Sequence, residues 1–499
     1  MDHYLSKLYS RINYELKTRV EPRDFKLYNI RALLARVGDP HLAYPVVHVA
    51  GTKGKGSVAT MVANILTAGS HQIGLFTSPH LQRINQRIVI DSLPIPDSDF
   101  ESVLAELDPQ IAAMDELCAE IRKSRTSKMS DQKSSPDDWL SPDPETGLPL
   151  TGKPLTFFEI MTAAAMLYFA NRKCDAVVLE VGLGGRLDST NVCDPAVSVI
   201  TNISLDHTRQ LGSTVDKIAF EKAGIIKQGV PVVCGSRDPI AVDVIQKVAN
   251  QRSADMFLLD RDFSVEEKRL NETVKQSTTY SRFEFDCRGE LCFADQATTE
   301  FNWEGLQVAM LGQHQRTNAA LAVAAVEALN AKNEWGITAD AISQGLLNTQ
   351  LEGRTQLFGE SPTVVLDVAH NVASASVLLQ TLQDELAVWS TAENKALILA
   401  ISADKDCEGI LRILLPAFDR VWITTYQDNP RGADANELFK LAKSVAAQDL
   451  LSTKIETTST PELAWQAATD SLETTDILCC TGSVFLIAEL IDLAREHGN

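Results

Sequence analysis

The sequence predicts an α/β protein built on parallel sheets, and three observations support this prediction. Short apolar runs alternate with amphipathic helical patterns, as expected for strands joined by crossover helices. A glycine-rich loop directly follows the first of these runs. The chain has 499 residues, enough for two or three domains, and its hydrophobic fraction of 44% is ordinary for a globular protein.

The predicted strands fall into two blocks. In the first block, before residue 240, the apolar runs are PVVHVA, CDAVVLEVG, AVSVITNIS and GVPVVCG. The second block begins near Leu351 and contains TVVLDVAHN, KALILAIS, RVWITTY and DILCCTGS. Between the blocks, residues 257–305 show polar β-type alternation, which predicts a small antiparallel sheet, and a helix follows around 318–330. We therefore expect two domains, at residues 1–350 and 351–499.

Residues 123–153 interrupt the first block with a stretch rich in Ser, Pro, Asp and Lys. Such a composition predicts an exposed loop inserted in the first domain. The sequence assigns no role to this loop.

Bulk properties exclude several classes of protein. The formal net charge of −20 argues against a nucleic-acid partner and against binding to an anionic membrane surface. No apolar run approaches eighteen residues and the N-terminus lacks a signal-peptide core, so we expect a cytoplasmic protein without a membrane span. The nine cysteines are scattered without a C-x-x-C pair, which argues against a disulfide framework or a zinc site. Cys479 and Cys480 lie in a strand pattern and are expected to be reduced core residues.

The strongest chemical signal is VVHVAGTKGKGS, residues 46–57. A strand, a glycine-rich turn and a helix N-terminus form a phosphate cradle, because glycines let backbone N–H groups approach the anion. Lys55 can then reach the terminal phosphates. The literal Walker pattern is not met, since Val49 stands where its first Gly is expected and a Gly separates Lys55 from Ser57. An ordinary strand-to-helix turn is the alternative, but the composition of the loop favours a nucleoside triphosphate site.

Two further loops follow predicted strands. Glu180 ends an apolar run, as does the acidic residue of a Walker-B strand that holds Mg²⁺; an exposed strand end is the alternative. Asp206 and His207 follow the next run, at the edge where open α/β sheets bind ligands. Lys222 lies fifteen residues after His207, in a helix that the capping-box-like residues 213–216 are predicted to open. From spacing alone, Lys222 is interpreted as a solvated helix lysine.

Nine motifs occur in order along the chain: GTKGKGS, SPHLQRINQRI, TFFE, LEVGLGGRLDSTN, LDHT, IAFEKAGIIK, GQHQRTNAA, LEGR and DVAHN. Together they resemble the motif set of the folylpolyglutamate synthase/dihydrofolate synthase family, a branch of the Mur ligase superfamily of ATP-dependent amide-forming enzymes. By motif the resemblance runs from about residue 28 to 372. It implies a Mur-ligase-like P-loop ATPase domain with a parallel-sheet core, followed by a smaller Rossmann-like glutamate ligase domain.

The resemblance also implies the reaction. ATP phosphorylates a carboxylate to an acyl phosphate, and the amino group of L-glutamate attacks it to form an amide. The implied substrates are dihydropteroate, reduced folates, L-glutamate and ATP, and the implied metal is Mg²⁺. We expect the protein to be a monomer.

Site residues are carried over from the family position by position. The residues implied to bind ATP are Gly54, Lys55, Gly56, Ser57, Asn318, Arg354 and Asp367. The implied magnesium ligands are Ser78, Glu180 and His207. The residues implied to bind the pterin substrate are Thr156, Phe157, Phe158, Glu159, Leu187, Asp188 and Ser189. The implied catalytic set is Lys55, Lys222, His207, Asp367 and His370, in which Lys222 matches a carbamylated lysine.

Several alternatives remain open at this point. For His370 a structural capping role is equally plausible, and one of Phe157 and Phe158 is expected to pack only in the core. TFFE resembles family members that accept dihydropteroate and favours a bifunctional enzyme. Lys53, where many bacterial members carry Asn, is more typical of mitochondrial and cytosolic folylpolyglutamate synthases and leaves the assignment between the two activities open. A Mur-type cell-wall ligase would need a uridine-binding N-terminal domain, and about 45 residues before the phosphate loop are too few. A non-catalytic nucleotide-binding module would be expected to have lost Lys55, Glu180 or His207.

Overall fold

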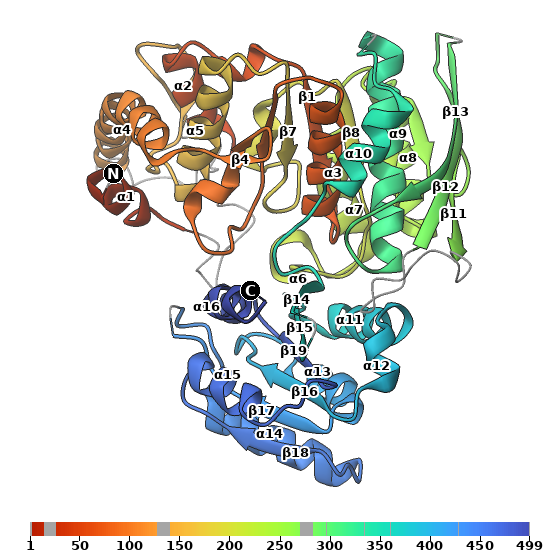
Figure 1. Cartoon of the computed structure of the whole chain (residues 1–499). Helices are drawn as coiled ribbons and strands as arrows, with labels where there is room; N and C mark the ends of the chain where they lie inside the picture. The colour runs from red at the N-terminus through yellow and green to blue at the C-terminus, as the bar shows by residue number, and fades with distance from the viewer. Residues whose placement is uncertain are drawn as a thin grey trace. The chain divides into compact units, whose positions relative to one another are not determined.

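The chain forms two compact units, coloured along the sequence in Figure 1. The computed structural model describes residues 2–13, 26–126, 140–269, 283–295, 297–333, 335–359, 361–427 and 429–498. Unit 1 comprises Met1–Val265, Cys287–Glu304 and Thr317–Leu346. Unit 2 comprises Glu266–Asp286, Gly305–Arg316 and Leu347–Asn499.

Unit 1 is built on an eight-stranded sheet with the order β10-β9-β8-β1-β7-β2-β3-β4. Its strands are β1 (Val46–Ala50), β2 (Ile73–Phe76), β3 (Ile88–Ile90), β4 (Leu93–Pro94), β7 (Ala176–Glu180), β8 (Val197–Ile200), β9 (Val232–Cys234) and β10 (Met256–Leu258). The strands from β10 to β2 pair in parallel, and β3 and β4 add an antiparallel edge. Every residue of β1 and β7 is buried, which explains why these strands read as continuous apolar runs.

The helices that flank this sheet fill most of the intervening sequence. They are α1 (Asp2–Tyr9), α2 (Tyr28–Arg36), α3 (Lys55–Ala68), α4 (Asp97–Thr126), α5 (Phe157–Asn171), α6 (Thr208–Leu211), α7 (Val215–Ala223), α8 (Pro239–Gln251), α9 (Gln313–Asn333) and α10 (Ala339–Leu347). Three short 3-10 helices are η2 (Pro40–Leu42), η3 (Ile84–Arg87) and η5 (Ser189–Val192). The helix predicted around residues 318–330 is thus confirmed as part of α9.

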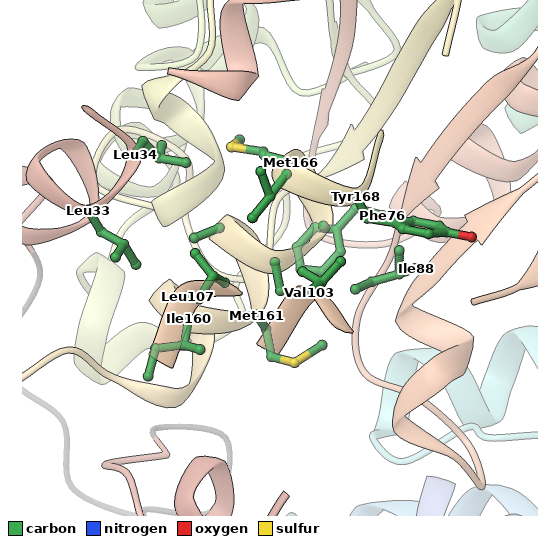
Figure 2. Packing of buried hydrophobic residues seen from close by; sticks show 14 of the residues in the cluster. Leu33, Leu34, Phe76, Ile88, Val103, Leu107, Ile160, Met161, Met166 and Tyr168 are labelled. Atoms are coloured by element: carbon green, nitrogen blue, oxygen red, sulfur yellow. The ribbon is translucent and has the colours of Figure 1, made fainter. Parts of the chain in front are cut away.

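One apolar core of unit 1 surrounds α5. This helix contacts α2, α4 and β2, so it is buried almost all round and carries apolar residues on every face. Figure 2 shows Ile160 and Met161 of α5 among Leu33 of α2, Leu107 of α4 and Phe76 of β2. A core of this kind fixes the start of α5, where the TFFE motif lies.

The polar stretch between the two blocks contains a separate three-stranded sheet of order β11-β12-β13. Its strands are β11 (Phe263–Arg269), β12 (Phe283–Cys292) and β13 (Thr298–Gln307). The small sheet predicted from the alternation is therefore present, although β10 belongs to the main sheet, where it pairs in parallel with β9.

The predicted exposed loop at residues 123–153 is only partly described. Helix α4 continues to Thr126, and residues 127–139 lie outside the described residues. The remainder forms a hairpin of β5 (Ser141–Pro142) and β6 (Pro149–Leu150). For this part the prediction of an exposed loop is confirmed at Pro142, Pro144, Glu145 and Gly147, but not at Asp143. That residue is fully buried and accepts from Arg36 Nε (2.7 Å) and Nη2 (2.5 Å) of α2.

Unit 2 contains a six-stranded sheet of order β14-β15-β19-β16-β17-β18, parallel except for β14. Its strands are β14 (Gln356–Phe358), β15 (Thr363–Leu366), β16 (Lys395–Leu399), β17 (Arg420–Ile423), β18 (Lys454–Thr457) and β19 (Ile477–Thr481). The accompanying helices are α11 (Val372–Glu385), α12 (Ala387–Thr391), α13 (Cys407–Leu414), η6 (Leu415–Ala417), α14 (Ala435–Gln448), α15 (Pro461–Thr469) and α16 (Val484–His497). The four strands predicted for the second block are β15, β16, β17 and β19.

Two further sequence predictions concern cysteines and membranes. Cys479 and Cys480 are buried, reduced thiols in β19, as predicted, and no disulfide links the cysteines of the described residues. Across the described ranges, no helix combines the length and the apolar character needed to cross a membrane.

The buried ion pair between Arg36 and Asp143 gives a stability prediction. Asp143→Ala should lower the free energy of unfolding by at least about 2 kcal/mol, because it leaves a buried guanidinium without its main partner. Urea unfolding followed by circular dichroism measures this change. Asp243→Ala, which breaks the exposed pair with Lys247, is the control and should leave the curve nearly unchanged. Equal effects of the two substitutions would contradict the anchoring role of Asp143.

Candidate functional site

The predicted phosphate loop connects β1 to α3 and is held from the next strand of the sheet. The Thr52 N–H donates to the Asn202 carbonyl (2.8 Å), and the Lys53 N–H donates to Asn202 Oδ1 (2.8 Å). Thr201 Oγ1 donates to the Lys53 carbonyl (2.6 Å). These contacts fix the backbone conformation of the loop. The N–H groups at the N-terminus of α3 are therefore held in fixed directions.

Gly54 at the N-cap of α3 explains why this loop needs glycine. Its φ of 81° lies in the left-handed region, and an added Cβ would lie 2.5 Å from Asn318 Oδ1. Asn318 of α9 is itself buried. The structure therefore brings together two predicted ATP-binding residues that are far apart in the sequence.

Glu180 and Ser78 meet beside the first turn of α3. The Ser78 N–H donates to Glu180 Oε2 (3.0 Å). A Cβ added at Gly56 would lie 3.6 Å from both carboxylate oxygens of Glu180. The structure thus places two of the three predicted magnesium ligands beside the phosphate loop, and their oxygen atoms are the hard donors that Mg²⁺ prefers.

Lys55, His207 and Lys222 line one small pocket at the carboxyl edge of the unit 1 sheet. The other residues that line this pocket are Gly51, Thr52, Gly182, Leu183, Gly184, Asp206 and Leu211. His207 has a left-handed backbone with φ 48° at the N-cap of α6, and its side chain is half exposed. Among the described residues, no cluster of three or more His, Cys, Asp or Glu side chains could hold a metal ion, so His207 is not gathered with Glu180 in such a cluster.

Lys222 is buried, which overturns its interpretation as a solvated helix lysine. Only 4% of it is exposed, and Nζ donates to the Gly51 carbonyl (2.6 Å). Burial, and the nearby positive charge of Lys55, lower the pKa of the Lys222 amine to about 7. The pocket therefore holds a lysine whose neutral form is available at neutral pH.

Asp206 supplies negative charge next to this lysine. Burial raises its pKa, but Lys53, whose Nζ lies 3.1 Å from Asp206 Oδ2, and His207 hold the pKa well below the ordinary range. The Asp206 carboxyl group is therefore ionised at neutral pH. Lys53 is thus placed to balance a charge in the pocket wall.

Among the residues predicted to bind the pterin, Asp188 has the side chain that accepts the most hydrogen bonds in the described structure. It caps η5, and its carboxylate accepts from Thr190 N (3.0 Å), Thr190 Oγ1 (2.6 Å) and Leu183 N (2.9 Å). Burial raises the pKa of this carboxyl. Leu183 lines the pocket, so Asp188 lies one residue behind the pocket wall, and Leu187 and Ser189 beside it are half-buried.

The TFFE motif makes a capping box at the start of α5. Thr156 Oγ1 accepts from the Glu159 N–H (3.2 Å), and Glu159 Oε2 accepts from the Thr156 N–H (2.8 Å). The capping box predicted at residues 213–216 is not formed, because α7 starts at Val215 with Thr214 as an N-cap that makes no side-chain cap bond. Thr156 and Glu159 are thus largely engaged with each other.

The two phenylalanines of TFFE have different surroundings. Phe157 is buried, with the Tyr9 ring 5.9 Å away and the Arg87 guanidinium 5.3 Å from its centroid. Phe158 lies against Phe76 (5.9 Å) and so close to Gly182 that an added Cβ would meet its ring at 2.6 Å. Since Gly182 lines the pocket, Phe158 is the one of the pair beside it.

Arg354, Asp367 and His370 lie in unit 2. Asp367 accepts from Thr355 N (2.8 Å), Thr355 Oγ1 (3.1 Å) and Ala369 N (2.8 Å). Burial raises the pKa of Asp367, and Arg354, which is exposed, opposes this shift. His370 Nδ1 lies 2.9 Å from the Val368 carbonyl, one residue before the N-cap of α11. The part of these residues in nucleotide binding stays a prediction.

Sequence reasoning missed Thr201 and Asn202, which hold the phosphate loop. A signal was present, because TN follows the buried run AVSVI at the carboxyl end of β8. It also missed Thr190 and His48, which lie behind Asp188: Thr190 Oγ1 lies 2.8 Å from His48 Nε2. His48 in VVHVA carries no such signal, because the sequence does not show which residue a single polar side chain in a buried strand will contact.

Comparisons with known proteins agree with this architecture. Residues 143–326 match the Mur ligase middle domain, and residues 353–484 match the Mur ligase glutamate ligase domain. The dihydrofolate synthase/folylpolyglutamate synthase of Bacillus subtilis is 33% identical over 431 residues, covering 86% of this chain and 86% of that protein.

Solved structures extend the similarity to the whole chain. Folylpolyglutamate synthase from Thermotoga maritima superposes with a TM-score of 0.74 at 31% identity, over 99% of this chain and 97% of that one. Mycobacterium tuberculosis folylpolyglutamate synthase complexed with ADP gives a TM-score of 0.77 at 29% identity, over 98% of this chain and 97% of that one. These similarities confirm the Mur-ligase-like fold class that the motifs predicted.

The lowered pKa of Lys222 predicts how stability depends on pH. The folded-state pKa is about 7 and the ordinary value is 10.5, so between these values the unfolded chain holds one more proton than the folded protein. Stability therefore rises with pH in this window. In CO₂-free buffer from pH 7 to 9, the wild type should gain up to about 1.4 kcal/mol per pH unit relative to Lys222→Met. Urea unfolding at each pH measures the difference.

The exposed Lys247 of α8 provides the matched control. Lys247→Met should follow the wild-type pH dependence. Parallel stability curves for the wild type and Lys222→Met would show that Lys222 keeps its ordinary pKa in the folded protein.

Proposed function

The chain belongs to the dihydrofolate synthase/folylpolyglutamate synthase family of Mur ligases, and on this basis we propose that it is an ATP-dependent ligase that adds L-glutamate to dihydropteroate and to reduced folates. The observation that supports this best is the pocket at the carboxyl edge of the unit 1 sheet. It joins Lys55 of the phosphate loop to the buried amine of Lys222. Such a pocket suits the transfer of a phosphoryl group next to a lysine whose pKa is lowered.

The phosphate loop binds and orients ATP in this proposal. Lys55 and the N–H groups at the start of α3 hold the terminal phosphates and stabilise the charge that develops during transfer. A substrate carboxylate oxygen attacks the γ-phosphorus, and ADP leaves. The amino group of glutamate then attacks the acyl carbon, inorganic phosphate leaves, and the nitrogen loses a proton to give the amide. The protein accelerates both steps mainly by positioning the reactants.

The oxygen atoms beside the phosphate loop fit a magnesium ion. Glu180 and Ser78 lie together next to Gly56, and they would hold Mg²⁺ with water, whereas the family's assignment of His207 as a third ligand rests on the resemblance alone. When bound, the ion neutralises charge on the phosphate groups. Glu180 is held by its hydrogen bond from Ser78 before any ligand enters.

The pterin substrate would meet one aromatic ring and one carboxylate. Phe158 beside Gly182 offers a ring face, and Asp188 behind Leu183 accepts N–H donors. Thr156 and Glu159 hold the helix that carries Phe158, and their capping box places this ring. Leu187 and Ser189 would complete the contact.

Lys222 is the proposed site of carbamylation. Its neutral amine can attack CO₂, which forms an N–C bond and releases a proton, and the product is an anion. The surroundings contain the positive charges of Lys53 and Lys55, which favour such an anion over an ammonium. The negatively charged carbamate would then attract and orient cationic groups, which the positively charged Lys222 ammonium would repel.

Turnover of two acceptors side by side tests the function. With ATP and L-glutamate, the purified protein should convert dihydropteroate to dihydrofolate and should also extend tetrahydrofolate. Lys55→Ala should reduce both rates by about two orders of magnitude, since it removes a charge-assisted contact to the transferring phosphate. Extension of tetrahydrofolate alone would establish the monofunctional alternative. Near-normal turnover by Lys55→Ala, with Lys247→Ala as control, would refute the phosphate-loop assignment.

The carbamate can be tested by spectroscopy and by substitution. Wild type in ¹³C-bicarbonate should show a carbamate carbon resonance that Lys222→Ala lacks and Lys247→Ala retains. Lys222→Ala should be nearly inactive, and Lys222→Glu should recover part of the rate because it restores a carboxylate. Full activity of Lys222→Ala together with the absence of the resonance in wild type would contradict this proposal.

A further inference from the structure

A row of buried hydrogen bonds runs from the centre of β1 to Asp188. An ionised carboxylate has about four lone-pair positions, two on each oxygen. On Asp188, Oδ1 accepts both the N–H (3.0 Å) and the hydroxyl (2.6 Å) of Thr190, and Oδ2 accepts the Leu183 N–H (2.9 Å). Donors from the described residues thus occupy three positions and leave one on Oδ2, the oxygen bonded to the pocket residue Leu183.

The Thr190 hydroxyl determines the proton position on His48. This hydroxyl is fully buried, and its single hydrogen is donated to Asp188. His48 Nε2 lies 2.8 Å from the same oxygen, so Nε2 must carry a proton and donate it. Hydrogen bonds through Thr190 and Asp188 thus link the His48 side chain, in the middle of β1, to the pocket residue Leu183.

His48 is held in this single tautomer. Burial, with a smaller effect of Lys227, lowers its pKa to about 3, so the ring is neutral. Its other nitrogen, Nδ1, is then an acceptor and lies 3.7 Å from Cys193 Sγ. Burial raises the pKa of the Cys193 thiol to about 12, so the thiol keeps its proton and donates. In the series Cys193–His48–Thr190–Asp188, each hydrogen bond thus has a fixed donor and a fixed acceptor.

We propose that Thr190 and His48 are positioning residues for the pterin substrate: they fix the Asp188 carboxylate so that Oδ2 presents one lone pair to one N–H donor of the substrate. Neither residue lines the pocket: His48 bonds Thr190, Thr190 bonds Asp188, and Asp188 bonds the pocket residue Leu183, so both act through Asp188. The inference rests on the proposed function, in which Asp188 contacts the pterin. It deepens that function, because it assigns substrate recognition to side chains that the substrate does not touch.

Isosteric substitutions of Thr190 separate this role from simple packing. Thr190→Val keeps the volume and removes the hydroxyl, whereas Thr190→Ser keeps the hydroxyl. Thr190→Val should raise the KM for dihydropteroate about tenfold and leave the KM values for ATP and L-glutamate within twofold. Thr190→Ser should stay within about threefold of wild type for all three substrates. His48→Gln, whose amide can donate in place of Nε2–H, should resemble Thr190→Ser.

Thr381→Val is the matched control, since it also removes a buried threonine hydroxyl, in α11 of unit 2. It should leave the KM for dihydropteroate unchanged. Thr190→Ala replaces Thr190→Val if the latter does not fold. Long-range ¹H–¹⁵N correlation of ¹⁵N-histidine protein should show His48 as the Nε2–H tautomer in wild type and lose this signature in Thr190→Val.

Three results would overturn the inference. Thr190→Val and Thr190→Ser could have equal effects, the KM for ATP could rise as much as that for dihydropteroate, or the latter KM could stay unchanged. In each case an active wild type leaves the proposed function standing. A wild type that turns over neither dihydropteroate nor tetrahydrofolate would refute the proposed function, and the positioning role would be refuted with it.

Discussion

The hydrogen bond from Lys222 Nζ to the Gly51 carbonyl is the interaction on which the candidate site depends. It ties the phosphate loop to α7, and α7 is tied in turn to the loop that carries Asp188, through Arg186 to Glu221 (2.8 Å) and Asn191 to the Gly224 carbonyl (3.1 Å). A buried lysine is costly unless it loses its charge or gains an anionic partner. The fold therefore keeps, beside the phosphate loop, a buried lysine whose pKa is lowered.

The fold could be predicted where both faces of a strand are buried. Strands β1, β7, β16 and β19 read as continuous apolar runs because helices cover the sheet on both sides, and each was found from sequence. Strand β2 has only four residues, IGLF, and escaped notice. Long-range partners were also invisible. The composition of residues 140–153 indicates an exposed loop, but it does not reveal that Asp143 within this segment is buried against Arg36 of α2.

The distinction between local patterns and long-range contacts also decides how much of the site could be predicted from the sequence. The glycines and lysines of the phosphate loop lie next to each other in the chain, so their chemistry is readable as a pattern. Gly54 and Asn318 are far apart in the sequence, and only the resemblance assigned both to the ATP site; that they lie side by side could not be predicted. Lys222 shows the limit of spacing most clearly, because a helix periodicity does not reveal that β1 and its loop cover that face of α7.

In the proposed function, recognition of the pterin is shared unequally among the residues that the motifs assign to it. Glu159 Oε2 accepts from both the N–H and the hydroxyl of Thr156, and Phe157 is enclosed between Tyr9 and Arg87. Under that proposal, the TFFE motif offers the pterin the ring of Phe158. Asp188 would supply the polar part of recognition, because protein donors already orient its carboxylate. Since the two Thr190 donors are buried, the substrate would not have to supply the free energy for this orientation.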